Sequence, residues 1–180
     1  MRVIAGTFKG RRLKPPTWEG LRPTSDKLRE TLFNILAPRI AGARVLDGFA
    51  GTGAIGIEAL SRGAAHVTFV DSDRRATGLI HHNLAACGVE RDYAVEQSPI
   101  EALLRRLPAE QRFDVIVLDP PYDAAGVENA LAAAVDRLAA GGILVLERAT
   151  RRNPEASPRL IRTRDVKSGD STLTFYTMAS

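Results

Sequence analysis

From Ala43 onward, short apolar segments alternate with longer segments whose apolar residues recur at helical spacing. The strongest apolar segment covers residues 113–118, and residues 115–118 within it are all apolar, as in strands that are covered on both faces. Strands that alternate with helices predict a mostly parallel sheet with helices on both faces. The pattern therefore predicts an α/β domain, and 180 residues are enough for one such domain.

The alternating part predicts five strands and four helices, followed by a closing hairpin. The strands are expected at 45–46, 65–70, 94–95, 113–118 and 142–146, and the helices at 54–60, 74–86, 100–107 and 127–138. Two further strands, 160–166 and 172–177, flank the turn-forming residues 167–170. They predict an antiparallel hairpin at the edge of a seven-stranded sheet.

The N-terminal residues have a different pattern. Two short segments, 2–5 and 11–13, flank residues 6–10, which begin and end with glycine, and this arrangement predicts a small β-hairpin. Prolines then keep the chain extended. We therefore expect a basic N-terminal arm over residues 1–23 and a domain over residues 24–180.

The first helix is expected directly after this arm. Thr24 or Ser25 can cap it, and Asp26 lies in its first turn, where the helix dipole favours a carboxylate. Apolar residues continue at helical spacing up to Pro38, which is expected to end the helix.

Charge is distributed unevenly along the chain, which has a net charge of +4. Residues 1–40 hold nine Lys/Arg and three Asp/Glu, residues 41–147 hold nine and fifteen, and residues 148–180 hold seven and three. The two basic ends can form one patch that attracts phosphates, or they can be separate solvated faces.

Composition excludes several classes of protein. Hydrophobic residues make up 44% and charged residues 26%, which is typical of a soluble globular protein. Cys87 is the only cysteine, so an internal disulfide or a cysteine-based zinc cluster is excluded, and no metal site is expected. The sequence has neither an apolar run of membrane-spanning length nor the apolar core of a signal peptide. We expect a cytoplasmic monomer.

A glycine-rich segment, residues 47–56, follows the first core strand and opens a helix. Ligands of such sheets bind outside the carboxyl ends of the strands, where glycines let the backbone approach closely. The glycine spacing matches the dinucleotide fingerprint, although Asp71 follows the last glycine by 15 residues instead of the usual ~20. Asp71 is expected to bind a ribose and Asp73 to cap the next helix, with the reverse assignment as the alternative.

Two cofactors suit this loop. Asp47 at its entrance would attract the sulfonium and ammonium of S-adenosylmethionine, whereas it would repel the pyrophosphate of NAD. A carboxylate that merely caps the loop backbone is the structural alternative. The predicted cofactor contacts are Asp47, Phe49, Ala50, Gly51, Gly53, Asp71, Ser72 and Ser98.

The segment Asp119–Tyr122, Asp-Pro-Pro-Tyr, ends the strongest strand. An exocyclic amine of a nucleobase is a poor nucleophile and needs acceptors for its N–H groups before it can attack a methyl group. Asp119 can accept one N–H and the Pro120 carbonyl the other, while Pro121 helps to fix the backbone. Tyr122 offers a face for a splayed-out base. Catalysis would then rest on positioning.

Taken together, these motifs resemble the bacterial small-subunit ribosomal RNA guanine-N2 methyltransferases, the RsmD-like family. The resemblance covers residues 2–122. Its stretches are 2–6, 10–13, 21–26, 29–34, 47–56, 58–63 and 119–122. The block from Leu21 to Asn34 is specific to this family, whereas the glycine loop and Asp-Pro-Pro-Tyr occur in many amine methyltransferases.

The resemblance implies a Rossmann-like class I methyltransferase fold, with S-adenosylmethionine as cofactor. It implies methylation of the exocyclic N2 amine of a guanine in small-subunit rRNA, within a ribosomal particle. It also implies that residues 22–24 lie near the active site and that the basic N-terminal hairpin contacts RNA. These substrate candidates are Arg2, Lys9, Arg11, Arg12, Arg22, Thr24 and Arg29.

Two departures from the family pattern affect the expected site. Family members usually carry Leu or another bulky residue where Gly48 stands, which predicts looser packing there. Such enzymes often place Asp or Asn after the third strand to bind adenine, whereas this chain has Ser98. Backbone groups or Gln97 are the alternatives for that contact.

Three other functions are compatible with some of these motifs. Asp-Pro-Pro-Tyr also serves adenine-N6 methylation of DNA or another RNA, although a sequence-reading DNA enzyme usually needs a further recognition domain. The glycine spacing alone would fit an NAD-dependent oxidoreductase. A non-catalytic RNA-binding module is the last alternative, which the intact segment Asp119–Tyr122 disfavours.

Overall fold

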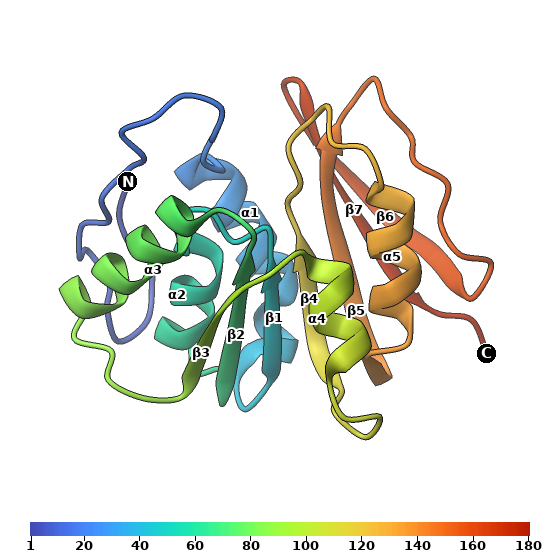
Figure 1. Ribbon diagram of the computed structural model, residues 1–180, viewed down its shortest axis with the longest axis horizontal. Helices are drawn as coiled ribbons and strands as arrows, with labels where there is room; N and C mark the ends of the chain where they lie inside the picture. Colours follow the sequence, from blue (N-terminus) through green and yellow to red (C-terminus); the bar gives the residue numbers. More distant parts are fainter.

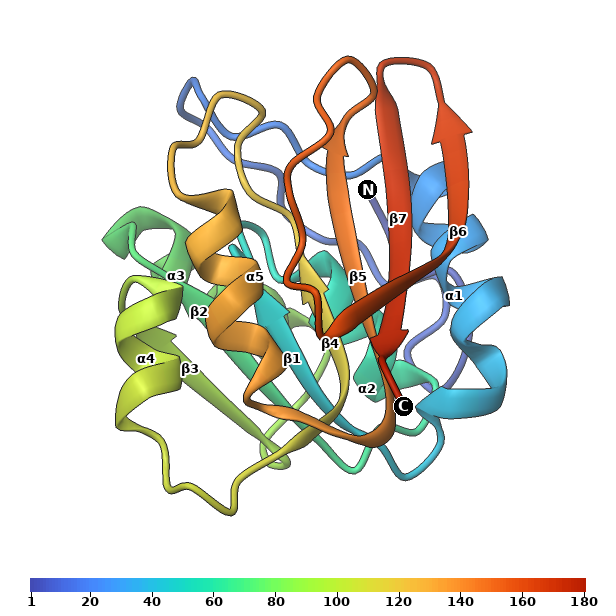
Figure 2. The same ribbon diagram turned by 90° about the vertical axis from the view of Figure 1, so that its right-hand side faces the viewer.

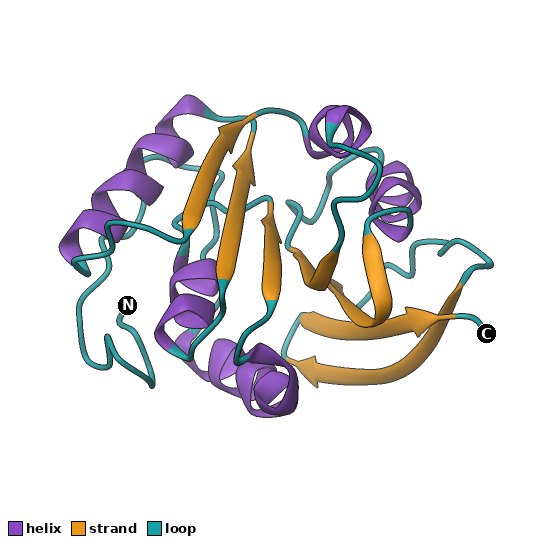
Figure 3. Cartoon of the chain, turned by 90° about the horizontal axis from the view of Figure 1, so that it is seen from below, coloured by secondary structure: helices purple, strands orange, loops and turns teal.

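A seven-stranded mixed sheet divides the protein into two helical layers (Figures 1 and 3). The computed structural model describes residues 1–180. Its elements are α1 (Asp26–Ile40), β1 (Arg44–Gly48), α2 (Ala54–Ser61), β2 (His66–Asp71), α3 (Arg74–Ala86), β3 (Tyr93–Gln97), α4 (Ile100–Arg106), β4 (Phe113–Leu118), α5 (Val127–Val135), β5 (Leu138–Ala149), β6 (Leu160–Ser168) and β7 (Ser171–Met178). The predicted α/β sheet is thereby confirmed.

The strand order β3-β2-β1-β4-β5-β7-β6 creates a crevice where the chain reverses direction. Strands β1 to β5 pair in parallel, and the chain passes from β1 outward to β3 before returning to β4 beside β1. Ligands of doubly wound sheets bind at such a reversal, outside the carboxyl ends of the strands. The fold therefore places the β1 and β4 loops side by side.

Both faces of the sheet are covered by helices (Figure 3). Helices α1, α2 and α3 pack on one face over a cluster of 25 buried apolar residues, and α4 and α5 pack on the other over a cluster of 17. Strands that are buried on both faces need continuous apolar runs, which explains the unalternating sequence of β4.

The chain closes with the predicted antiparallel hairpin, in which β7 lies between β5 and β6 (Figure 2). Both strands are longer than expected, so that the turn shrinks to Gly169 and Asp170. Strand β7 pairs with β5 along its carboxyl half, where Glu147 lies opposite Leu173. The last strand thus supports the end of β5 that faces the crevice.

The expected boundary between the fifth helix and the fifth strand is wrong. Helix α5 ends at Val135, and β5 begins at Leu138, which pairs with Phe113. Gly141 has a φ of +73°, and the β4–β5 register shifts at this level. The two glycines at 141 and 142 therefore form an irregularity inside the strand, instead of preceding it.

The expected N-terminal β-hairpin is also wrong, because the structure has one isolated bridge, Arg2–Arg12, and no strands there. The Val3 N–H donates to Arg11 O at 2.9 Å, so the two segments do run side by side. Beyond Val3, however, the N–H groups of Ile4 and Ala5 donate to Glu58 instead of to the opposite segment. The Glu58 side chain on α2 thus accepts the N–H groups that would otherwise extend the pairing of the two segments.

Helix α1 begins as expected but does not end at Pro38. Ser25 is the N-cap residue, and its side chain accepts the Leu28 N–H at 3.1 Å. Pro38 lies within the last turn, where its missing N–H removes one hydrogen bond without stopping the helix. The buried side chain of Ile40 continues the packed face, and Gly42, with a φ of +75°, follows the end of the helix.

Candidate active site

The crevice at the carboxyl ends of the parallel strands forms a cavity of about 1000 Å³. Its walls come from the loops after β1, β2 and β4, from the extended segment 18–25 and from the β6–β7 turn. A volume of this size accommodates a nucleoside cofactor and part of a substrate.

The glycine loop is held in place by Asp71. Its Oδ2 accepts the Gly51 N–H at 2.9 Å, and its Oδ1 accepts the Asp73 N–H at 2.9 Å. Asp73 caps α3 by accepting the Arg75 N–H at 2.8 Å, as predicted. Asp71 also lines the cavity, so the remaining lone pairs of its carboxylate face the space where a ribose is expected.

Asp47 is a buried carboxylate at the entrance of the loop. Its Oδ2 accepts the Gly56 N–H at 2.9 Å, and the residue lines the cavity. Burial raises the pKa of Asp47 to about 8, and the charge of Asp71 adds to this, whereas the hydrogen bond from Gly56 opposes it. A cation in the cavity would favour the ionised form of Asp47.

The glycines of the fingerprint differ in role. A Cβ on Gly51 would lie 3.1 Å from the Leu21 side chain, and this glycine faces the cavity. A Cβ on Gly56 would lie 2.2 Å from the Phe69 ring, so this glycine lets α2 pack against the sheet. Gly53, a predicted cofactor contact, does not line the cavity, and a Cβ on it would lie 3.3 Å from Ile80 and 3.5 Å from Phe69.

Asp119 lies beside a second carboxylate, that of Glu147 in β5. The Thr24 Oγ1 lies 2.9 Å from Asp119 Oδ2 and 2.9 Å from Glu147 Oε2. A hydroxyl has one hydrogen, so it donates to one carboxylate at a time. Burial and the nearby Glu147 raise the pKa of Asp119 well above its ordinary value. Asp119 therefore favours holding a proton beside the Glu147 carboxyl group.

Tyr122 is fixed at both its backbone and its hydroxyl. Its hydroxyl forms a hydrogen bond with Ser171 Oγ, and its carbonyl accepts a hydrogen bond from Arg152 at 2.6 Å. The Arg22 guanidinium lies 5.7 Å from the centre of the Tyr122 ring. A base that stacks on Tyr122 would thus meet a cation next to an aromatic platform.

The extended segment 18–25 forms one side of the cavity, as the family resemblance implied for residues 22–24. Leu21 packs against Gly51, and the Arg75 guanidinium lies 5.0 Å from the centre of the Trp18 ring. Thr24 contacts Asp119, so one short segment touches the glycine loop, α3 and the Asp-Pro-Pro-Tyr motif.

Most predicted site residues converge on this cavity. Those lining it are Asp47, Phe49, Ala50, Gly51, Asp71, Ser72, Asp119, Pro120, Pro121, Tyr122, Arg22 and Thr24. Glu147, Trp18 and Leu21 were missed. For Glu147 a signal existed, because it directly follows the apolar run 142–146 just as Asp71 follows the run 65–70.

Ser98, a predicted cofactor contact, does not line the cavity. Its side chain is 6% exposed. Its hydroxyl donates to Pro99 O at 2.9 Å and accepts a hydrogen bond from Arg106 at 3.2 Å. The hydroxyl is therefore already engaged in joining the end of β3 to α4.

The looser packing expected at Gly48 is also wrong. A Cβ there would lie 2.6 Å from Leu118 Cδ2 and 3.2 Å from Ile100 Cδ1. The neighbouring side chains thus fill the space that a larger residue would take.

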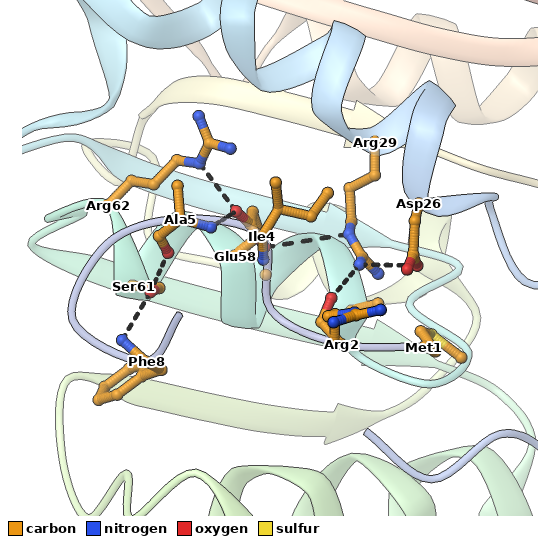
Figure 4. Close-up of polar contacts among 12 residues, drawn as sticks. Met1, Arg2, Ile4, Ala5, Phe8, Asp26, Arg29, Glu58, Ser61 and Arg62 are labelled. Atoms are coloured by element: carbon orange, nitrogen blue, oxygen red, sulfur yellow. Dashed lines mark hydrogen bonds and ion pairs between the residues drawn. The ribbon is translucent and has the colours of Figure 1, made fainter. Parts of the chain in front are cut away.

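Arg29, a predicted RNA contact, lies inside the protein instead (Figure 4). Its side chain is 0% exposed, 3.1 Å from Asp26 and 4.0 Å from Glu58, and it donates to Arg2 O. Glu58 also accepts the Ile4 N–H at 2.9 Å. Arg29 and Glu58 therefore fasten the N-terminal arm to α1 and α2.

The exposed basic residues at positions 2–12 of the arm do not line the cavity. Ser61 and Arg62 end α2, and the Thr7 N–H donates to Ser61 O at 2.8 Å, so the arm's turn sits at the far end of that helix. Arg11 donates to Cys87 O at the C-terminal end of α3, where a cation suits the helix dipole. Arg2, Lys9, Arg11 and Arg12 are exposed.

No group of three His, Cys, Asp or Glu side chains is arranged to hold a metal ion. None of the helices has both the length and the apolar character that crossing a membrane would require.

Residues 1–177 match the model of the protein family described as "Conserved hypothetical protein 95". The chain belongs to this family. It is 44% identical over 124 residues to "Ribosomal RNA small subunit methyltransferase D" of Haemophilus influenzae, across 68% of this chain and 64% of that protein. It is 45% identical over 123 residues to "Putative rRNA methyltransferase YlbH" of Bacillus subtilis, across 68% and 67%. The match thus spans less than two thirds of the Haemophilus relative.

Solved structures extend the likeness over nearly the whole chain. The protein described as "Putative methyltransferase yhhF from Escherichia coli" is 33% identical, with a TM-score of 0.85 over 99% of this chain and 97% of that one. The family resemblance predicted from the sequence motifs is confirmed, and so is the α/β methyltransferase fold.

Proposed function

We propose that this protein is an S-adenosylmethionine-dependent methyltransferase that acts on the exocyclic N2 amine of a guanine in small-subunit ribosomal RNA. The observation that carries the proposal is one cavity that holds Asp47 on one side and Asp119–Tyr122 on the other. A binding site for a cation thus adjoins a set of acceptors for an amine. The relatives named as rRNA methyltransferases support the class of substrate.

The residues present fit the cofactor. Asp47 has no cationic partner within the protein, and its carboxylate suits an ammonium or a sulfonium. Gly51 leaves its backbone open to a ligand, and Asp71 can accept hydrogen bonds from a ribose. When bound, S-adenosylmethionine supplies an electrophilic methyl group on its sulfonium.

The chain's own contribution to the chemistry is to prepare the amine. Asp119 accepts one N–H of the substrate, and the Pro120 carbonyl, which accepts no hydrogen bond within the protein, accepts the other. These two acceptors draw the nitrogen lone pair out of conjugation with the ring. The carboxyl pair of Asp119 and Glu147 can take the proton that the amine releases.

Recognition of RNA would use separate parts of the surface. The target base has to leave its stack to reach Asp119, and Tyr122 with Arg22 offers a platform for it. Exposed Arg2, Lys9 and Arg12 would bind phosphates beyond the base site. A structured RNA within a ribosomal particle supplies the shape that so small a protein needs for selection.

The test is methyl transfer from labelled S-adenosylmethionine to unmethylated small subunits and to their naked RNA, with the labelled nucleoside identified by mass. We expect N2-methylguanosine. Asp119→Ala should lower kcat about 100- to 1000-fold, because the amine loses a positioned acceptor. The control Glu110→Gln removes an exposed carboxylate outside the cavity and should leave the rate unchanged. N6-methyladenosine, or no transfer at all, would overturn the proposal.

A further inference from the structure

Glu147 is a buried carboxylate whose bonding within the protein is incomplete. It is 5% exposed, and its only hydrogen bond through the side chain comes from the hydroxyl that also lies 2.9 Å from Asp119. A carboxylate offers about four acceptor positions. A buried charge without a partner is costly, so it is retained where something else binds it.

The open side of Glu147 faces ligand space. The residue lines the large cavity together with Asp119, and it also lines a smaller neighbouring cavity of about 260 Å³, with Pro120, Pro121 and Tyr122 between the two. Since Thr24 Oγ1 is 2.9 Å from both carboxylates, their oxygens lie close enough together to meet two neighbouring donors of one base.

Guanine and adenine differ in the atoms they would present to such a pair. Guanine carries two adjacent donors on its pairing edge, N1–H and N2–H, whereas adenine carries a donor beside the N1 acceptor. We propose that Glu147 selects guanine: its carboxylate accepts the N1–H of the target base while Asp119 accepts an N2–H. The N1 lone pair of adenine would face the carboxylate and be repelled. This inference rests on the proposed function, and it assigns base specificity to a residue outside Asp119–Tyr122.

The arrangement also accounts for Thr24. In the absence of a base, the Thr24 hydroxyl and the proton that Asp119 favours holding are what offset the two adjacent carboxyl groups. Two N–H donors of a guanine would supply that compensation in their place. A base with one donor and one acceptor cannot do so.

The experiment compares two RNA trinucleotides, uridines flanking a central guanine or a central 2-aminopurine. The latter keeps the N2 amine but has an acceptor at N1. Binding to the full chain is measured with S-adenosylhomocysteine present, by 2-aminopurine fluorescence and by competition. The variants are Glu147→Gln, which keeps an oxygen for the Thr24 hydroxyl, and the control Glu110→Gln.

We expect wild type and Glu110→Gln to prefer guanine, and Glu147→Gln to lose about 10- to 100-fold of that preference, since its amide can donate to N1 of 2-aminopurine. Equal weakening of both ligands, as from a purely structural role, would overturn the inference. So would a wild type without a preference for guanine. The binding assay needs no methyl transfer. If Glu147→Gln loses the preference for guanine but wild type transfers no methyl group to RNA, the proposed function is rejected while the assignment of Glu147 stands.

Discussion

The two ends of helix α2 hold buried carboxylates in opposite conditions. At the C-terminal end, Glu58 accepts hydrogen bonds from Ile4, Ala5 and Arg62 and lies 4.0 Å from Arg29. At the N-terminal end, Asp47 receives one hydrogen bond from Gly56. Across the cavity from it, Asp119 and Glu147 have a single hydroxyl between them.

Glu58 at the C-terminal end of α2 thus stabilises the fold, whereas the carboxylates at the cavity remain available to a ligand. A saturated carboxylate such as Glu58 is fully compensated by the fold and has nothing left to offer a ligand. The carboxylates at the cavity keep open acceptor positions and like-charged neighbours, and such perturbed groups cluster at functional sites. Local bonding, more than burial itself, distinguishes the two ends.

The saturated end should be the one on which stability depends most. We expect Glu58→Gln to lower the free energy of unfolding by about 3 kcal/mol, because it leaves the buried Arg29 guanidinium with the half-exposed Asp26 as its one remaining counter-charge. Urea unfolding measures this loss. The double variant with Arg29→Met should lose much less than the sum of the two single variants, because it removes both charges. Additive losses would show that the pair is not coupled.

Asp47, at the N-terminal end of α2, should affect stability in the opposite way, because removing its charge should stabilise the protein. The pKa of Asp47 is raised to about 8, so the folded state binds a proton more tightly than the unfolded state does, and stability falls as the pH rises from about 4 to about 8. Asp47→Asn keeps an acceptor for Gly56 but carries no charge. We expect its stability advantage over wild type to grow by about 1.4 kcal/mol per pH unit between about pH 4 and pH 8, with no difference near pH 4.

Urea unfolding of the free protein at pH 4.5, 6.5 and 8.5 tests this expectation. Asp119 titrates in both proteins, and because the charge of Asp47 also raises the pKa of Asp119, the difference between them reports Asp47 together with that coupling. The same substitution should weaken binding of S-adenosylmethionine. If the two stability profiles ran parallel across this pH range, Asp47 would not be the source of the dependence.

The smallest expected effect concerns RNA binding by the N-terminal arm, which contacts the C-terminal end of α2. If Lys9 and Arg12 bind phosphates, the double substitution to Ala should reduce the salt dependence of RNA binding by about two charges, with kcat unchanged. Filter binding over a range of salt concentrations measures the slope. The matched control replaces Arg105 and Arg112, which are exposed outside the cavity and the arm. An unchanged slope for Lys9 and Arg12 would place the RNA elsewhere.

Local patterns predicted the fold where one strand or helix decided its own position. All seven strands of the sheet and all five helices were expected, because apolar runs and caps are local signals. The start of β5 was missed because the glycines at 141 and 142 resemble a turn until their partner strand is known. The β-hairpin within the arm was wrongly predicted because Glu58, more than fifty residues away, accepts the N–H groups of Ile4 and Ala5.

Residues of the candidate site were likewise predicted where a local pattern marked them and missed where only contacts between distant residues did. Asp47, Asp71 and Asp119 were predicted because each follows an apolar strand, and the carboxyl ends of parallel strands meet at one edge. The closeness of Thr24 to Glu147 joins residues 123 positions apart, which no local pattern contains. Arg29 appeared to be a surface cation because nothing in its own helix shows that Glu58 will lie against it.

The antiparallel pairing of β7 has a consequence for the order of assembly. Ser171 holds the Tyr122 hydroxyl, and Leu173 lies opposite Glu147, so both sides of the base site depend on the strand that is synthesised last. The glycine loop, in contrast, is held by Asp71 and by strand β1, whose pairing needs no strand beyond β4. During synthesis the cofactor half of the site can therefore form early, while the half that recognises the base forms only once β7 has threaded between β5 and β6. A nascent chain would hold its cofactor before it could distinguish one base from another.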